Sequence, residues 1–259
     1  DIVALVKWHQ GETDKRGLLP YLLEYYGTLV RRRRTPGYEI GIYRMDDLFP
    51  PTVSQQLRVD FGPLQLVDAQ IQASSPADEA VTVALSWRKT GTIDRPLKVA
   101  LKLVDKGGHE VAREDRWLRD LVGMTTDAWA LTQEVCNYYV VGLYPGLAPV
   151  SYQLQVTVYG EDDPQGLDVL DAAGAPAGKA YDLATVELLP PGNRADRRID
   201  TATLGIRNLD SPIEAAPGLW LEGVGIVKDR FTSGETLSCL LLWHASGRER
   251  LPDYAITLS

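Results

Sequence analysis

The sequence predicts a mainly β protein built around an antiparallel β-sandwich of the Ig-like or jelly-roll type. Three observations lead to this prediction. Short runs that alternate apolar and polar residues follow one another from residue 58 to residue 188, turn sequences rich in Gly, Pro and Asp separate them, and helical spacing is confined to the N-terminal region. A closed barrel is the alternative, because periodicity alone does not distinguish it from a sandwich.

Residues 1–49 form a small αβ unit in this prediction. The nearly continuous apolar run "IVALVKW" indicates a buried strand, "LLPYLLEYYGTLV" has helical spacing, and "YEIGIYRM" at 38–45 alternates as a strand does. Pro20 suits the first turn of the helix and Gly27 weakens or ends it. Strand, helix and strand together are too small to fold alone.

A run of four arginines, Arg31 to Arg34, follows the predicted helix. It has two interpretations. One is a solvated helix end, where cations complement the helix dipole. The other is a patch for anionic lipid head groups, since each cation near a charged membrane contributes about 1 kcal/mol.

The rest of the chain divides into a linker at 50–57, a first sandwich at 58–188, a second linker at 189–202 and a partial second sandwich at 203–259. Both linkers are rich in Pro, as in "FPPT" and "LLPPG". The first sandwich contains eight predicted strands, and its clearest hairpin is "DKGG" at 105–108, where adjacent glycines tolerate a positive φ.

An internal repeat connects the two sandwiches. "GLWLEGVGI" resembles "PLQLVDAQI", which aligns Ile226 with Ile71, and "LLLWHASGRERLP" resembles "LSWRKTGTIDRP", so that Trp243 corresponds to Trp87. A proline follows each tryptophan after nine residues. We interpret both tryptophans as core residues of tandem sandwiches. Because an incomplete sandwich leaves an open apolar face, either the protein continues beyond this sequence or these strands pair with the first sandwich, and we expect continuation.

Composition excludes several classes of protein. The chain has 259 residues, of which 44% are hydrophobic, so it can build a core and should fold. A formal net charge of -8 argues against a nucleic-acid partner.

No run reaches the ~18 apolar residues of a membrane-spanning helix, and no signal peptide opens the chain. Cys136 and Cys239 fall in different repeats, so we expect two buried free thiols.

Motifs for catalysis are absent from the sequence. It contains no phosphate-binding loop, dinucleotide fingerprint or nucleophile elbow, and its three histidines, His9, His109 and His244, have no metal-ligand spacing. The best metal candidate is the acidic stretch "GEDDPQGLDVLD", in which Asp162, Asp163 and Asp168 offer hard oxygen ligands suited to calcium. A solvated turn is the alternative, and no other cofactor is expected.

Two tryptophans are candidate ligand-binding residues. Trp117 and Trp129 lie in the polar stretch "REDRWLRDLVGMTTDAWA" rather than in an apolar strand. An exposed aromatic ring stacks on the apolar face of a sugar, whereas a buried one fills the core. The alternative for both residues is therefore a structural role.

The quoted motifs also resemble a known family. "LVKWHQGETDKRGLLPYLLEYYGTLV" with "GYEIGIYRM" is similar to the end of the soluble αβ subdomain of bacterial polytopic glycosyltransferases of the protein-mannosyltransferase-like class. Trp87, "LVDKGGHEVAREDR", Trp129, "YQLQVTVYG" and "GLDVLDAAGAPAG" resemble the β-sandwich tails of such proteins. Where those tails place Pro-Gly before the Tyr strand, this chain has "APVSYQL".

The resemblance implies a non-catalytic accessory region on the extracytoplasmic face of the cell membrane, joined to the membrane through a region that precedes residue 1. It would bind or present a glycan or protein acceptor. The catalytic acids of the family lie in its membrane portion, so no catalytic residue transfers to this chain. A structural or protein-interaction sandwich with no small ligand is the alternative function.

Overall fold

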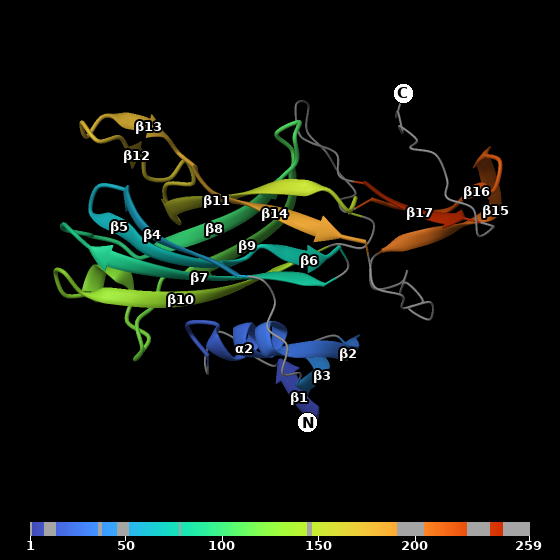
Figure 1. The fold of residues 1–259 in the computed structure, drawn as a ribbon, viewed down its shortest axis with the longest axis horizontal. Helices are drawn as coiled ribbons and strands as arrows, with labels where there is room; N and C mark the ends of the chain where they lie inside the picture. The colour runs from blue at the N-terminus through green and yellow to red at the C-terminus, as the bar shows by residue number, and fades with distance from the viewer. Residues whose placement is uncertain are drawn as a thin grey trace. The chain divides into compact units, whose positions relative to one another are not determined.

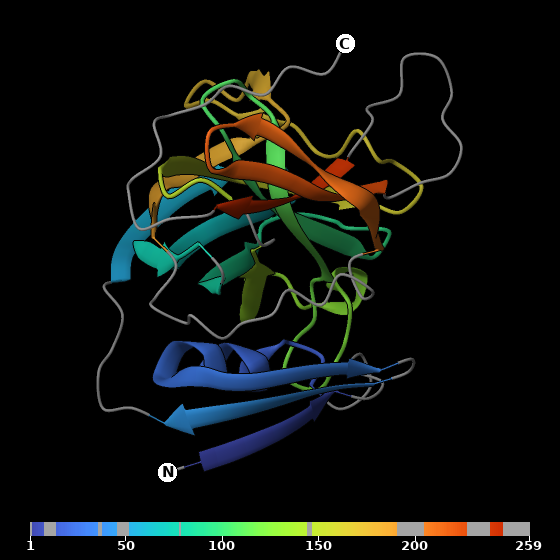
Figure 2. The same cartoon turned by 90° about the vertical axis from the view of Figure 1, so that its right-hand side faces the viewer.

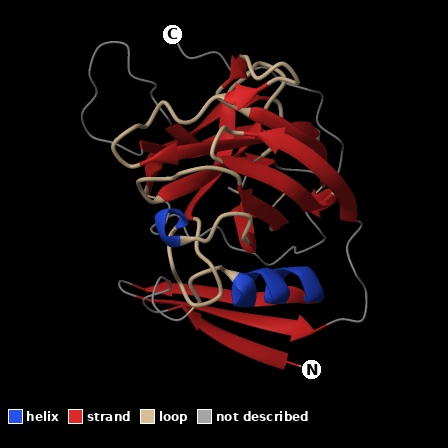
Figure 3. Ribbon diagram, turned by 90° about the vertical axis from the view of Figure 1, so that its left-hand side faces the viewer, coloured by secondary structure: helices blue, strands red, loops and turns tan. Residues whose placement is uncertain are grey.

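The computed structural model describes residues 2–7, 14–35, 38–45, 52–77, 79–143, 147–190, 205–226 and 239–245, and these divide into two compact units, 1–195 and 196–259 (Figure 1). Most of the described chain is strand, as the colouring in Figure 3 makes plain. The prediction of a mainly β sandwich fold is confirmed.

A three-stranded antiparallel sheet and one helix form the N-terminal part of the first unit. The strands are β1 (Ile2–Lys7), β2 (Gly27–Thr35) and β3 (Tyr38–Met45), in the order β1-β3-β2, and the helix is α2 (Leu18–Tyr26). Helix α2 covers one face of the sheet, where Leu23, Leu29 and Tyr43 are buried together. Gly27 ends the helix, as predicted, in an extended conformation.

Two details of this region differ from the sequence prediction. Arg31 to Arg34 belong to strand β2 and not to a helix end, because the chain turns into the sheet directly at Gly27. Strand β1, predicted to be buried, is covered on one side only, since Ile2 and Val6 are 73% and 58% exposed.

Two sheets pack face to face to form the sandwich. One has the strand order β10-β7-β5-β4-β12-β13 and the other β6-β14-β11-β8-β9. All pairs are antiparallel except β14 with β6. The strands are β4 (Thr52–Asp60), β5 (Leu64–Gln72), β6 (Ser74–Pro76), β7 (Ala80–Lys89), β8 (Leu97–Val104), β9 (Glu110–Trp117), β10 (Glu134–Gly142), β11 (Ser151–Gly160), β12 (Val169–Leu170), β13 (Pro176–Gly178) and β14 (Tyr181–Leu189).

The predicted linkers are described only in part. Strand β4 already begins at Thr52, so most of the segment 50–57 is strand rather than linker. Residues 50 and 51, and residues 191–202 of the second linker, lie outside the described residues.

The sandwich core lies between the two sheets and consists of alternate residues from each strand. Trp87 is fully buried there, with its ring centroid 5.8 Å from that of Phe61, so its predicted core role is confirmed. The hairpin at 105–108 is also confirmed: Gly108 has a φ of 83°, and the Gly108 N–H donates to the Asp105 carbonyl over 3.0 Å.

Helix α2 and the loop before it also pack on strand β10 of the sandwich. The Tyr21 and Tyr138 rings lie 5.0 Å apart between centroids, and the Tyr138 N–H donates to the Arg16 carbonyl over 2.9 Å. Gly17, with a φ of 76°, permits this approach, because a Cβ atom there would lie 2.5 Å from the Tyr138 carbonyl oxygen. Figure 2 shows the helix along the N-terminal sheet. The αβ unit therefore rests on the outer side of the six-stranded sheet.

The second unit contains one described three-stranded sheet, with β15 (Ile206–Ala216), β16 (Leu219–Ile226) and β17 (Cys239–Ala245) in that order. Leu221 pairs with Trp243, as Leu66 pairs with Trp87 in the first unit, and the register shifts by one residue directly after each leucine. Trp243, in contrast to Trp87, is only half-buried. Pro252, the repeat's last landmark, lies outside the described residues.

Candidate ligand-binding site

The outer face of the five-stranded sheet carries a row of long side chains from three neighbouring strands. Lys98 on β8 pairs with Trp117 on β9 and with Tyr159 on β11, so all three side chains point to the same side of the sheet. The neighbouring residues Leu97 and Val99 point into the core. Trp117, Lys98 and Tyr159 are each half-buried, which leaves part of the row open to solvent.

A hydrogen-bonded polar cluster adjoins this row. The Tyr159 hydroxyl donates to the Asp115 carboxylate over 2.5 Å, and the Arg113 Nη2 donates to the same carboxylate over 2.8 Å. Burial alone would raise the pKa of Asp115, but the hydrogen bonds from Arg113 and Tyr159 outweigh it and hold that pKa below its ordinary value. Asp115 is therefore a carboxylate at neutral pH, with its orientation fixed.

A small residue separates the parts of this surface. Ala100 lies between Asp115 and Thr157 in the cross-strand register, and beyond it Lys102 lies between Arg113 and Gln155. Ala100 is only 1% exposed, so the long polar side chains around it cover this position. Aromatic rings beside hydrogen-bond donors and acceptors can hold a polyhydroxylated ligand, because such a ligand has both apolar faces and hydroxyl edges.

This surface contains Trp117, one of the two tryptophans that the sequence predicts to bind a ligand. The Lys98 Nζ lies 4.2 Å from the centroid of the Trp117 ring, a cation–π arrangement, and also pairs with Glu161 over 3.0 Å. The ring is thus held in place, with one of its faces occupied by the ammonium group.

Trp129 lies elsewhere, in the loop directly after the short 3-10 helix η1 (Thr126–Ala128), and the residue is only 3% exposed. Its Nε1 donates to the Met124 carbonyl over 3.0 Å. A buried ring has no face for a ligand, so this placement argues against the predicted binding role of Trp129.

A buried lysine fixes the loop that contains Trp129. Lys89 is 7% exposed, and its Nζ donates to the carbonyl oxygens of Thr126, Asp127 and Trp129 over 3.1, 3.1 and 2.8 Å. Three charge-assisted hydrogen bonds offset the desolvation of the ammonium group. The loop between β9 and β10 therefore has a defined shape.

The acidic stretch predicted as a calcium site is lined by cations. Asp163 pairs with Arg95 over 3.4 Å, and Asp168 pairs with Lys179 over 2.8 Å. Asp162 is exposed. Among the described residues, no group of three or more His, Cys, Asp or Glu is placed to hold a metal ion. This geometry gives no support to calcium binding here, and the metal site stays a prediction.

The cysteines and histidines form no reactive arrangement that the structure describes. Cys136 and Cys239 are free, as predicted, but each is half-buried rather than buried. His109 contacts Asp105 over 3.2 Å on an exposed hairpin, and His244 lies 3.4 Å from Glu222. His9 lies outside the described residues.

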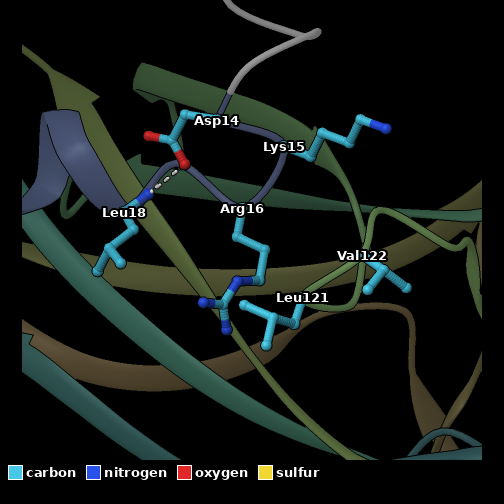
Figure 4. Close-up of a pocket in the computed structure, with 6 residues that line it drawn as sticks. All are labelled: Asp14, Lys15, Arg16, Leu18, Leu121 and Val122. Atoms are coloured by element: carbon cyan, nitrogen blue, oxygen red, sulfur yellow. Dashed lines mark hydrogen bonds between the residues drawn. The ribbon is translucent and has the colours of Figure 1, made fainter.

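A groove also runs between the loop before α2 and the turn after β9 (Figure 4). It has a volume of about 330 Å³ and is lined by Asp14, Lys15, Arg16, Leu18, Leu121 and Val122. The Asp14 carboxylate accepts hydrogen bonds from the Leu18 and Leu19 N–H groups over 3.0 and 2.7 Å, so it caps the helix. Figure 4 shows the first of these bonds.

The far wall of the groove is an apolar turn. Leu121 and Val122 are 79% and 75% exposed at its tip. The turn is nonetheless well fixed, because the Asp120 Oδ1 accepts from the Val122 and Met124 N–H groups over 3.1 and 2.8 Å, and Gly123 has a φ of 90°. Two exposed aliphatic side chains on an ordered turn suit contact with another protein better than they suit catalysis.

Sequence reasoning missed Lys98, Arg113 and Tyr159. The alternation in "YQLQVTVYG" already places Tyr159 on the solvent side of a strand. Its position beside Lys98 and Trp117 depends on the pairing register of three strands, which a single sequence does not specify.

No protein-family model matches this chain, and no curated protein matches it significantly. Among solved structures, it is similar to a β-glucuronidase from glycoside hydrolase family 2, at 9% sequence identity and a TM-score of 0.31. The match covers 46% of this chain and 11% of the length of the β-glucuronidase.

Proposed function

We propose that this chain is a non-catalytic accessory region of a membrane glycosyltransferase, and that the outer face of its five-stranded sheet binds or presents a glycan. The observation that supports this best is the row Trp117–Lys98–Tyr159, which lies beside the Arg113–Asp115 pair on an exposed sheet face. The resemblance of the sequence motifs to glycosyltransferase tails favours the same role.

Different residues of this face contact different parts of the sugar in this proposal. The face of the Trp117 indole opposite Lys98 would pack against the C–H groups of a pyranose ring, as aromatic rings do with apolar surfaces. Arg113 and Lys98 donate hydrogen bonds to hydroxyl oxygens, and the Asp115 carboxylate accepts from hydroxyl hydrogens. Because Arg113 and Tyr159 already orient Asp115, little conformational entropy is lost on binding.

In this proposal, catalysis and the membrane-spanning segments belong to other parts of the protein. None of the described helices is long and apolar enough to cross a bilayer. The acceptor glycan would be held at the extracytoplasmic surface near the active site, without a cofactor in this region.

Titration of the chain with a panel of oligosaccharides, followed by calorimetry or by NMR of the backbone amides, tests the proposal. We expect the amides of β8, β9 and β11 to shift, and Trp117→Ala to weaken binding about tenfold or more, because a stacked aromatic ring is lost. Trp220→Ala is the matched control, since Trp220 is half-buried in the second unit. Absence of binding by every glycan, or equal loss in both variants, would contradict the proposal.

The alternative function, a protein-interaction module, has its own observation in the ordered apolar turn at Leu121 and Val122. Under this alternative, replacing both residues by Ser weakens co-elution of the chain with the membrane portion of its parent protein, while Trp117→Ala leaves it unchanged. The two variants thus separate a glycan site on the sheet from a protein contact at the groove.

A further inference from the structure

The N-terminal sheet has a second face, opposite helix α2, that the described residues leave open. Ile2, Ala4 and Val6 of β1 pair with Arg44, Ile42 and Ile40 of β3, so these six side chains lie on one face. Ile2, Ala4 and Val6 are exposed. The face is about 20 Å long at ~3.3 Å per residue over six positions.

The open face carries apolar side chains, whereas a sheet face in contact with water normally carries polar ones. An antiparallel sheet with one side in water normally alternates apolar residues inside with polar residues outside. Strand β1 is apolar at both kinds of position: Val3 and Leu5 pack toward the helix, and Ile2 and Val6 point away from it. The pattern is that of a sheet covered on both sides.

Arginines border the apolar residues. In the pairing of β2 with β3, Arg31 lies opposite Ile42 and Arg33 lies opposite Ile40, which places both arginines on the open face. Both are exposed, as is Arg44 on the central strand. Val30, the extra residue of the bulge before Arg31, is 53% exposed.

The charge on this face is opposite in sign to that of the protein. The whole chain has a formal net charge of -8, yet no described side chain on the open face is acidic. The surface that covers this face should therefore combine apolar character with negative charge.

A second copy of the chain fits poorly. A two-fold contact would bring the same face of both copies together and would oppose their arginines without a described carboxylate between them. The interface of a bilayer fits well, because anionic head groups lie directly above hydrocarbon.

We propose that the open face of the sheet β1-β3-β2 binds the surface of an anionic lipid membrane. Ile2, Val6 and Val30 enter the boundary between head groups and acyl chains, and Arg31 and Arg33 pair with lipid phosphates or carboxylates. The sheet lies flat on the bilayer and does not cross it. This contact is independent of whether the sandwich binds a glycan.

Sedimentation of the whole 259-residue chain with vesicles tests the proposal. We expect binding to vesicles of phosphatidylcholine and phosphatidylserine in equal parts, and far weaker binding to phosphatidylcholine alone. Replacing Arg31 and Arg33 by Gln should weaken partitioning about 30-fold, as expected for two cations removed from an anionic surface. Arg58→Gln with Arg207→Gln is the matched control, because both arginines are exposed and lie on other sheets.

A second variant tests the apolar contribution. Val6→Ser should weaken partitioning about fivefold at unchanged charge, since an exposed valine can then no longer enter the interface. Circular dichroism checks that each variant is folded. Equal binding to both kinds of vesicle, equal loss in the Arg58/Arg207 control, or dimerisation through this face would overturn the proposal.

Discussion

Two sets of three neighbouring strands in this molecule share one pattern of pairing but differ in burial. In β4-β5-β7, Leu66 lies opposite Trp87, and in β15-β16-β17, Leu221 lies opposite Trp243. Trp87 is fully buried, whereas every described residue of β17 is at least partly exposed. The six-stranded sheet that contains β4, β5 and β7 faces the five-stranded sheet across a core. No described residue of the second unit belongs to a second sheet.

The difference shows which properties of a sandwich are local. Strand pairing, register and the bulge after the leucine arise from neighbouring strands, so they recur where the sequence recurs. Burial depends on a facing sheet, which comes from strands distant in sequence. A tryptophan in a repeated strand is therefore a core residue only where its partner sheet is present.

The strongest test of this comparison replaces each tryptophan by alanine. Trp87→Ala should lower the free energy of unfolding of the first unit by about 3–5 kcal/mol, because it removes a large, fully buried side chain. Trp243→Ala should cost the second unit less than half as much, since its ring is already half solvated. Urea denaturation followed by circular dichroism measures both. Equal costs would mean that a partner sheet covers Trp243 in solution.

A substitution of Lys89 tests a stabilising interaction that the first unit has and the second lacks. Lys89 follows Trp87 by two residues, and the corresponding residue after Trp243 is Ala245. Lys89→Met should destabilise the first unit by about 3 kcal/mol, because the Thr126, Asp127 and Trp129 carbonyls lose a charged donor inside the protein.

Lys179→Met is the control for that prediction. Lys179 is 45% exposed, and its Nζ donates to one carbonyl, that of Gly166. Its replacement should cost under about 1 kcal/mol. Thermal unfolding measures the stability lost in each variant. A similar loss for both lysines would show that the burial of Lys89 does not strengthen its hydrogen bonds.

The smallest expected effect is the change with pH in the stability that Asp115 contributes. Because the folded pKa of Asp115 lies below its unfolded value, its contribution to stability is complete above about pH 5 and is lost as the pH falls through the folded pKa. The difference in unfolding free energy between the wild type and Asp115→Asn should therefore shrink below about pH 4.

That contribution should stay under about 1 kcal/mol, since the side chain is about one third exposed. Unfolding curves recorded between pH 3 and pH 7 measure it. It should appear in the first unit alone. A difference that grows on acidification would mean that Arg113 and Tyr159 do not stabilise the carboxylate.

Local patterns predicted the fold well. Alternation predicted the sandwich, the two glycines predicted the hairpin at 105–108, and Gly27 predicted the end of the helix. The arginine run was assigned to the wrong element, because cations complement the dipole at the end of a helix, whereas here pairing with β3 places the run in a strand. The pattern of strand β4 was missed, since adjacent prolines precede it and many of its residues are polar.

The candidate site was predicted only in part. Trp117 was identified because it interrupts a polar stretch, but the same reasoning selected Trp129, which is buried. A sequence shows which residues flank a tryptophan along the chain. It does not show that Lys89, some forty residues earlier, holds the loop of Trp129 against the core. Lys98 and Tyr159 likewise become neighbours of Trp117 only through sheet register.

The contact between the loop before α2 and strand β10 also affects solubility. Strand β10 is the outermost strand of its sheet, and an open edge can recruit a strand of another molecule and start aggregation. The Arg16 carbonyl occupies the Tyr138 N–H, and helix α2 lies beside this edge. Removal of the N-terminal 45 residues would uncover both, so the sandwich without its αβ unit should be the more aggregation-prone form of this protein.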